Sequence, residues 1–137
     1  MGVSFIEYIF RHPAPGFEFF FLVSDGIHKN LSNQINSNDC VELISISPAK
    51  ILTGKASRKR ISKIEASFNP DIVYSLGFPS YVEFKNLEIG RYTNPWEIFP
   101  AKEAWKLLSK REKIPMYLKL KYRIFWAKKA DYFETQT

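Results

Sequence analysis

The stretch Phe17-Glu18-Phe19-Phe20-Phe21-Leu22-Val23 gives the strongest indication of the fold. It is short and mostly aromatic, with prolines and Gly16 before it and Asp25-Gly26 after it. An apolar run of this length between turn-forming residues is typical of a buried strand. The sequence therefore predicts a core that is built on β-structure and begins near Phe17.

Other segments alternate between apolar and polar side chains, as strands with one buried face do. We predict further strands at Val3–Phe10, Val41–Ser47, Ile51–Ile64, Tyr81–Ile89 and Tyr117–Phe125. For the first of these a short helix is the alternative. Two short helices are expected at Ile27–Ile35 and Pro100–Ser109, where the apolar residues recur at helical spacing.

These elements together predict an α+β fold, either a small β-barrel or a strongly curved mixed sheet with short flanking helices. One domain is expected to span residues 1–137, with 1–16 as an N-terminal extension, 17–126 as the core and 130–137 as a frayed tail. The composition supports a folded core, because 45% of the residues are hydrophobic and 16% are aromatic.

The sequence lacks the marks of membrane and secreted proteins. No apolar run approaches the ~18 to 20 residues of a membrane-spanning helix, and no basic segment followed by an apolar one begins the chain. The single cysteine, Cys40, permits no internal disulfide, and its neighbours favour a structural thiol. We therefore expect a cytoplasmic location and no membrane partner.

The sequence also points away from an enzyme. Neither of the common glycine-rich phosphate loops is found. The two histidines, His12 and His28, lie in different predicted elements without metal-binding spacing, so no metal and no cofactor is expected. His28, at the start of a helix, is the better functional candidate. A nucleophile–base pair of Cys40 with His28 is disfavoured by the helix predicted between them.

The net charge of +6 is concentrated in two blocks. Residues 49–64 hold six basic and no acidic residues, and residues 101–137 hold ten basic and four acidic ones. Basic side chains attract phosphates, and neighbouring aromatic rings can stack on bases. We therefore predict nucleic-acid binding, to RNA rather than DNA, by two sets of side chains: Lys55, Arg58, Lys59, Arg60 and Lys63 in the first block, and Lys119, Lys121 and Arg123 on one face of the last strand.

A likeness to a known family is carried by the order and spacing of five segments: Phe19–Ser24, His28–Ile35, Asn38–Leu43, Ile51–Ala56, and Tyr81–Phe84 followed by Asn94–Ile98. Over roughly residues 17–126 the chain resembles the PUA-like superfamily, particularly its EVE and ASCH branches. The resemblance implies a compact β-barrel that binds RNA or a modified base in a small pocket. It assigns to that pocket Ser24, Asp25, His28, Thr53 and Trp96.

Two alternatives to an RNA-binding module stay open. One is a protein-interaction or host-defence factor whose basic face meets an acidic protein partner. The other is a small hydrolase of modified nucleosides, because some ASCH proteins that resemble this chain use a Lys, a Thr and a Glu for that reaction. Thr53 and Lys55 are the residues here that keep this alternative open.

Overall fold

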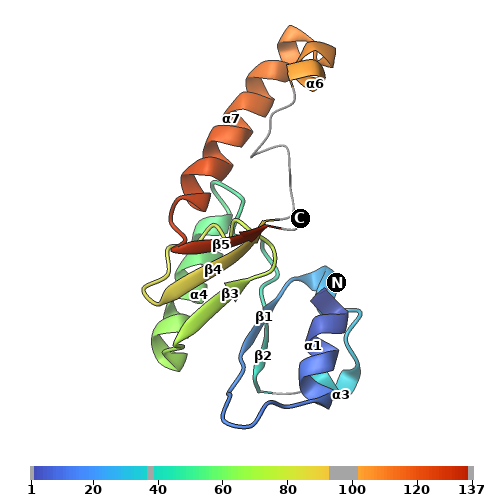
Figure 1. The fold of residues 1–137 in the computed structure, drawn as a ribbon, viewed down its shortest axis with the longest axis vertical. Coiled ribbons are helices and arrows are strands. Elements are labelled where there is room, and N and C mark those ends of the chain that lie inside the picture. Colours follow the sequence, from blue (N-terminus) through green and yellow to red (C-terminus); the bar gives the residue numbers. More distant parts are fainter. Residues whose placement is uncertain (1, 37–38, 93–101, 136–137) are drawn as a thin grey trace. The chain divides into compact units, whose positions relative to one another are not determined.

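The protein, seen as a computed structural model, is described for residues 2–36, 39–92 and 102–135 (Figure 1). Its elements in chain order are α1 (Gly2–Arg11), β1 (Phe21–Val23), α2 (Asp25–His28), α3 (Asn33–Asn36), β2 (Val41–Leu43), α4 (Gly54–Phe68), β3 (Ile72–Ser75), β4 (Leu87–Tyr92), α6 (Lys102–Leu107), α7 (Lys110–Ala127) and β5 (Tyr132–Thr135). The chain divides into two compact units, residues 1–61 and 62–137.

The first unit is built on a parallel pair of strands. β1 and β2 pair with Phe21 opposite Val41 and Val23 opposite Leu43. Parallel neighbours need a crossover connection rather than a hairpin, and here α2 and α3 supply it. The core of this unit is a cluster of four buried side chains from α1, β1 and the α2–α3 region: Ile6, Val23, Leu31 and Ile35.

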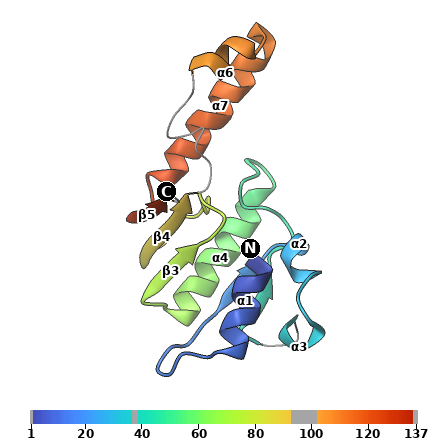
Figure 2. The ribbon, with the colours of Figure 1, turned by 45° about the vertical axis from the view of Figure 1, so that its right-hand side comes forward.

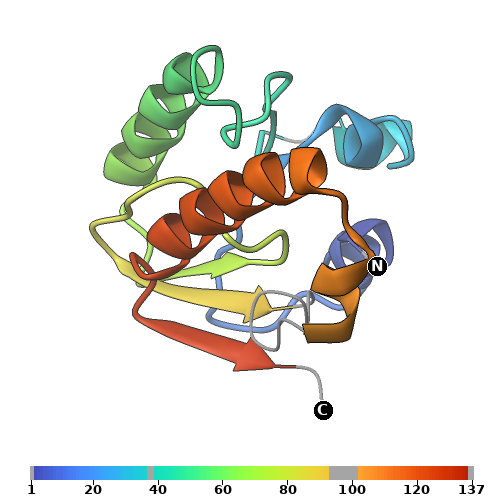
Figure 3. The same ribbon diagram turned by 90° about the horizontal axis from the view of Figure 1, so that it is seen from above.

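The second unit contains a three-stranded sheet in the order β3-β4-β5, and both of its strand pairs are parallel. The crossover from β4 to β5 contains α6 and α7. Figure 1 shows the part of α4 that belongs to this unit behind β3 and β4, and in Figure 2 it lies beside β3. Seen from above, in Figure 3, α4 and α7 lie on the same side of the sheet. The strand register places Ile72, Tyr74, Leu87 and Tyr132 on one face, and all four are exposed. We call this the open face.

Two acidic side chains hold the second unit together from inside. Glu65 of α4 is 5% exposed, and its Oε1 accepts hydrogen bonds from the backbone N–H groups of Lys85 and Asn86 at 2.6 and 2.9 Å. Asp131 accepts one from the backbone N–H of Glu88 at 2.9 Å and donates its own N–H to the carbonyl of Glu88. These bonds fix the entry to β4 and the start of β5.

The predicted barrel or curved mixed sheet is wrong. The described residues contain two small sheets, every strand pair in them is parallel, and neither sheet closes. The arrangement is α+β. Helices lie in the crossovers of the parallel pairs β1–β2 and β4–β5, whereas the connection from β3 to β4 is irregular. Three segments predicted as strands are helical, namely Val3–Phe10 within α1, Ile51–Ile64 largely within α4, and Tyr117–Phe125 within α7.

Both long helices have a local cause. The residues that α4 buries, Gly54, Ser57, Ile61 and Glu65, recur every three or four positions, which is the spacing of one helix face. In α7 the Ser109 hydroxyl accepts from the backbone N–H of Glu112, while the Glu112 carboxylate accepts from that of Ser109. This reciprocal capping starts the helix, which then continues through Pro115.

The remaining boundaries also differ from the predicted ones. The strand predicted for residues 17–23 is confined to β1, and the helix predicted for Ile27–Ile35 is divided into α2 and α3. The strand predicted for Tyr81–Ile89 overlaps β4 only from Leu87 on. The expected N-terminal extension contains α1, and the tail expected to be frayed contains β5.

Candidate functional site

Parallel strands bring their carboxyl ends to one edge of a sheet, and ligands of open sheets of this kind bind outside that edge. In the first unit this edge follows β1 and β2. Ser24 and Asp25 come directly after β1 and are exposed, while His28, at the end of α2, is half-buried. These three predicted pocket residues therefore lie at the kind of edge where ligands bind, and their role in a pocket stays a prediction.

The segment that follows β2 is fixed by an arginine of α4. The Arg58 guanidinium donates to the backbone carbonyls of Pro48, Lys50 and Ile51, the last two at 3.0 Å. Gly54, at the start of the helix, approaches this segment so closely that a side chain there would meet the carbonyls of Ser47 and Pro48. Thr53 is exposed in the turn just before the helix. The Arg58 side chain thus organises this loop through hydrogen bonds to the backbone of the loop.

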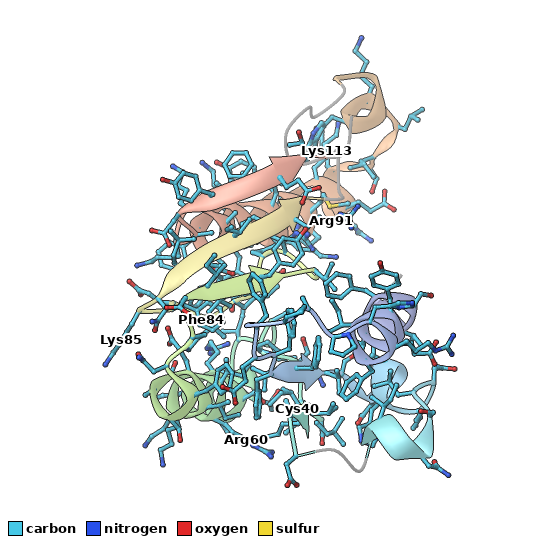
Figure 4. All side chains as sticks on the ribbon, turned by 60° about the horizontal axis from the view of Figure 1, so that its bottom comes forward. Cys40, Arg60, Phe84, Lys85, Arg91 and Lys113 are labelled. Atoms are coloured by element: carbon cyan, nitrogen blue, oxygen red, sulfur yellow. The ribbon has the colours of Figure 1, made fainter. Side chains whose placement is uncertain are left out.

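In the second unit the carboxyl-end edge brings together three side chains that are far apart in the sequence. The register pairs Tyr74 with Ile89 and Arg91 with Glu134, so Tyr74, Arg91 and Glu134 all lie on the open face near the ends of their strands. The Tyr74 hydroxyl donates to Oε2 of Glu134 at 2.6 Å, from β3 to β5. Figure 4 shows Arg91 near the end of β4, the strand between them. We call these three side chains the strand-end cluster.

Within the strand-end cluster, Glu134 and Arg91 change the pKa of Tyr74 in opposite directions. The hydrogen bond to Glu134 raises the pKa of Tyr74, burial and the charge of Glu134 raise it further, and the positive charge of Arg91 lowers it. The Nε atom of Arg91 is shielded from solvent, and it has no hydrogen-bond partner within the described part of the chain. A buried polar atom of this kind calls for a partner. The cluster therefore offers a cation with hydrogen-bonding capacity to spare, beside a hydroxyl and a carboxylate.

A fourth ionisable group lies nearby on β4, on the face opposite to the open face. Glu88 is 2% exposed and accepts a hydrogen bond from the Ser75 hydroxyl at 2.6 Å. Burial raises the pKa of Glu88, and the hydrogen bonds from Ser75 and Ser80 act against that rise. Because both its side chain and its backbone are engaged inside the unit, Glu88 is a structural group rather than a ligand-binding one.

The first predicted basic set lies on α4 and is divided by the helical period. Lys55, Lys59 and Lys63 are exposed and recur every four residues, so they share one side of the helix. Arg60 is directed elsewhere, because its guanidinium pairs with the Glu42 carboxylate at 2.7 Å. Figure 4 labels Arg60 on this helix. Three lysines of the set are thus presented together, while Arg58 and Arg60 make contacts within the protein.

The second predicted basic set was expected on one strand face, and that geometry is wrong. Lys119, Lys121 and Arg123 lie on α7, where residues two positions apart point about 200° away from each other. Lys119 and Lys121 are exposed and Arg123 is half-buried. These side chains do not form a single stripe. Nucleic-acid binding by either set stays a prediction.

Trp96, the remaining predicted pocket residue, lies outside the described residues. Within the described ranges, no group of three or more His, Cys, Asp or Glu side chains is arranged to hold a metal ion, and no helix is long and apolar enough to cross a membrane. Cys40 is half-buried and forms no disulfide, and burial is the main cause that raises the pKa of its thiol.

No family model, curated protein or solved structure matches the chain. The resemblance to the PUA-like superfamily therefore stays a prediction, and its expected barrel is replaced by the two parallel sheets.

The strand-end cluster was not predicted from the sequence. Tyr74, Arg91 and Glu134 are brought together by strand register alone, and none of them lies in a motif. One signal was available. The short β-branched run Ile72-Val73 follows Asn69-Pro70, which is the turn-then-strand pattern of β3. A strand predicted there would have placed Tyr74 near a strand end.

Proposed function

We propose that this chain binds a small phosphorylated ligand of the nucleotide or sugar-phosphate class at the strand-end cluster of its second unit. Arg91 carries the proposal, because its Nε is buried without a hydrogen-bond partner in the described part of the chain. Guanidinium groups bind phosphate oxygens with paired, charge-assisted hydrogen bonds.

The neighbours of Arg91 suit the rest of such a ligand. The Glu134 carboxylate accepts hydrogen bonds, as it already does from Tyr74, and carboxylates at the ends of parallel strands commonly accept from sugar hydroxyls. The exposed rings of Tyr74 and Tyr132 on the open face offer apolar surface to a base or a sugar. A phosphate, hydroxyls and a flat apolar group together describe a nucleotide. A cytoplasmic location belongs to this proposal, supported by the single cysteine, which permits no internal disulfide.

The test is a binding titration of the whole chain with a panel of nucleotides and sugar phosphates, compared with the same compounds lacking phosphate. Arg91→Gln should weaken binding of the phosphorylated compounds by about tenfold to a hundredfold, the cost of one charge-assisted contact. The matched control is Lys85→Gln, which removes the same charge from an exposed side chain just before the opposite end of β4 (Figure 4).

The proposal requires that Arg91→Gln alone weakens binding and that compounds without phosphate bind less tightly. If Lys85→Gln weakens binding as much as Arg91→Gln does, the loss of affinity is caused by the change in net charge and not by the loss of a specific contact. Unchanged affinity in the Arg91 variant would move the site away from the strand-end cluster.

Nucleic-acid binding is the second candidate, and the exposed row Lys55, Lys59 and Lys63 favours it. Changing the three lysines to Gln should weaken RNA binding and reduce its salt dependence by about three units of slope at most. The same variant should leave the binding of a mononucleotide at the strand-end cluster unchanged, so this one variant distinguishes the two candidate functions.

A further inference from the structure

The side of α7 that faces solvent carries a row of apolar side chains at helical spacing, from residue 114 to residue 125. Their exposed fractions are 67% for Ile114, 51% for Tyr117, 61% for Leu118 and 55% for Phe125. We call these four the outer face. Other side chains anchor the helix to its own unit, because the rings of Tyr122 and Trp126 contact the ring of Tyr81 at centroid distances of 5.6 and 6.5 Å.

Lysines lie among the apolar side chains of the outer face. By the helical period Lys110, Lys121 and Lys128 fall between Tyr117 and Ile114, and all three are exposed. The Nζ of Lys121 lies 5.4 Å from the centre of the Tyr117 ring, and the Nζ of Lys129 lies 5.6 Å from that of Phe125. Residues 110–129 hold eight basic residues and one acidic residue, a net charge of +7.

We propose that the outer face of α7 binds the surface of an anionic lipid bilayer, with the helix lying in the plane of the interface. A helix that combines exposed apolar side chains with lysines and arginines has the chemistry of interfacial binding. The lysines meet the phosphates of the lipid headgroups, and Ile114, Leu118 and Phe125 reach the boundary between headgroups and acyl chains. This inference goes beyond the proposed ligand site and does not depend on it.

The apolar row distinguishes a lipid surface from the other partners that a basic helix attracts. A nucleic acid would pair with the lysines but would leave the aliphatic side chains of Ile114 and Leu118 in water. A second copy of the chain would place one +7 segment against another, and like charges repel. A bilayer with anionic headgroups suits both the lysines and the apolar side chains, because its negative charge lies directly above its apolar layer.

A surface helix of this kind does not have to meet the criterion for a membrane-spanning one. That criterion requires ~20 consecutive apolar residues, whereas interfacial binding depends on exposed apolar side chains together with basic ones. The inference departs from the expectation of no membrane partner only as a proposal, and it agrees with the finding that no described helix can cross a membrane.

The experiment is co-sedimentation of the whole chain with two sets of vesicles, one of phosphatidylcholine alone and one with phosphatidylglycerol added. The key variant is Ile114→Ser/Leu118→Ser, with circular dichroism to verify that it is folded. Its matched control is Ile51→Ser/Leu52→Ser, which makes the same changes at an exposed apolar pair in the first unit, where the fractions are 68% and 88%. Phe125→Trp supplies a fluorescent reporter on the outer face.

We expect binding to the anionic vesicles and much weaker binding to the neutral ones. The Ile114/Leu118 variant should bind the anionic vesicles about tenfold or more weakly, because two apolar side chains no longer leave water. The control should bind like the unchanged chain, and the tryptophan emission of the Phe125→Trp variant should shift to shorter wavelength.

Three outcomes would overturn the proposal. One is the absence of binding to anionic vesicles. Another is unchanged binding by the Ile114/Leu118 variant, which would leave charge alone as the cause. The third is a dimer of the unchanged chain that disappears in this variant, because a second copy would then be the partner of the outer face.

Discussion

Replacing Glu65 tests whether one buried carboxylate holds the loop that enters β4. Glu65→Ala leaves the backbone N–H groups of Lys85 and Asn86 without their acceptor. Each unsatisfied donor costs about 1 to 3 kcal/mol when it is buried. Both bonds are only partly buried, so water can reach the vacated space, and the lower part of that range applies. We expect a loss of about 2 to 3 kcal/mol in the free energy of unfolding, a large share of the ~5 to 15 kcal/mol available to a domain.

The assay is urea unfolding followed by circular dichroism. The midpoint should fall by about 1 to 2 M if the slope is unchanged. Glu65→Gln keeps an oxygen in place but removes the charge that strengthens both bonds, and it should cost roughly half as much. The control is Glu83→Ala, because Glu83 is exposed and pairs with Lys129 only at the surface, and such pairs contribute about 0 to 1 kcal/mol. If Glu65→Ala costs no more than Glu83→Ala, the carboxylate does not hold the loop.

Two further predictions concern β4. The ring of Phe78 lies directly against Gly90, where a Cβ would overlap it. Gly90→Ala should therefore lower the free energy of unfolding by about 1 to 3 kcal/mol, and adding Phe78→Leu should recover part of that loss. An Ala variant as stable as the unchanged chain would show that the ring has another position. Burial raises the pKa of Glu88, so its contribution to stability is fully present below the ordinary carboxyl pKa and is lost as the pH rises through the raised value. Glu88→Gln should remove that loss, so its stability relative to the unchanged chain should be higher at pH 7 than at pH 4, and an equal difference at both pH values would contradict the assignment.

The sequence predicted short-range features better than the pairing of strands. The strand predicted at Val41–Ser47 is present over Val41–Leu43, and a helix lies within the predicted Pro100–Ser109; both follow from local pattern and turn residues. Strand direction has no local signal. Whether neighbours are parallel depends on what connects them, and the crossover from β4 to β5 was not recognised because Tyr117–Phe125, inside α7, was taken as a strand. In α4 the buried face hides the helical pattern, because two of its four positions are Ser57 and Glu65 rather than apolar residues.

The strand-end cluster could not be predicted from the sequence, because it also depends on how the strands pair. Tyr74 and Glu134 are sixty residues apart and meet only because β3 and β5 are both parallel to β4. A pairing error of one residue would turn Arg91 to the other face of the sheet. Its place beside Tyr74 is therefore a result of register, which a single sequence does not specify.

The residues that led to the wrong strand in the last third of the chain are also the ones that carry the lipid proposal. Alternation over Tyr117–Phe125 would place Leu118 and Leu120 together in a core and the lysines together in water. The helix instead separates the two leucines, since Leu118 is exposed and Leu120 is half-buried. The available local signal was the capping pair Ser109 and Glu112, which predicts a helix start eight residues before Tyr117. Once α7 is a helix, its charge no longer forms the stripe expected for RNA. It forms a mixed basic and apolar surface, and that mixture favours a lipid interface over a polyanion without an apolar layer.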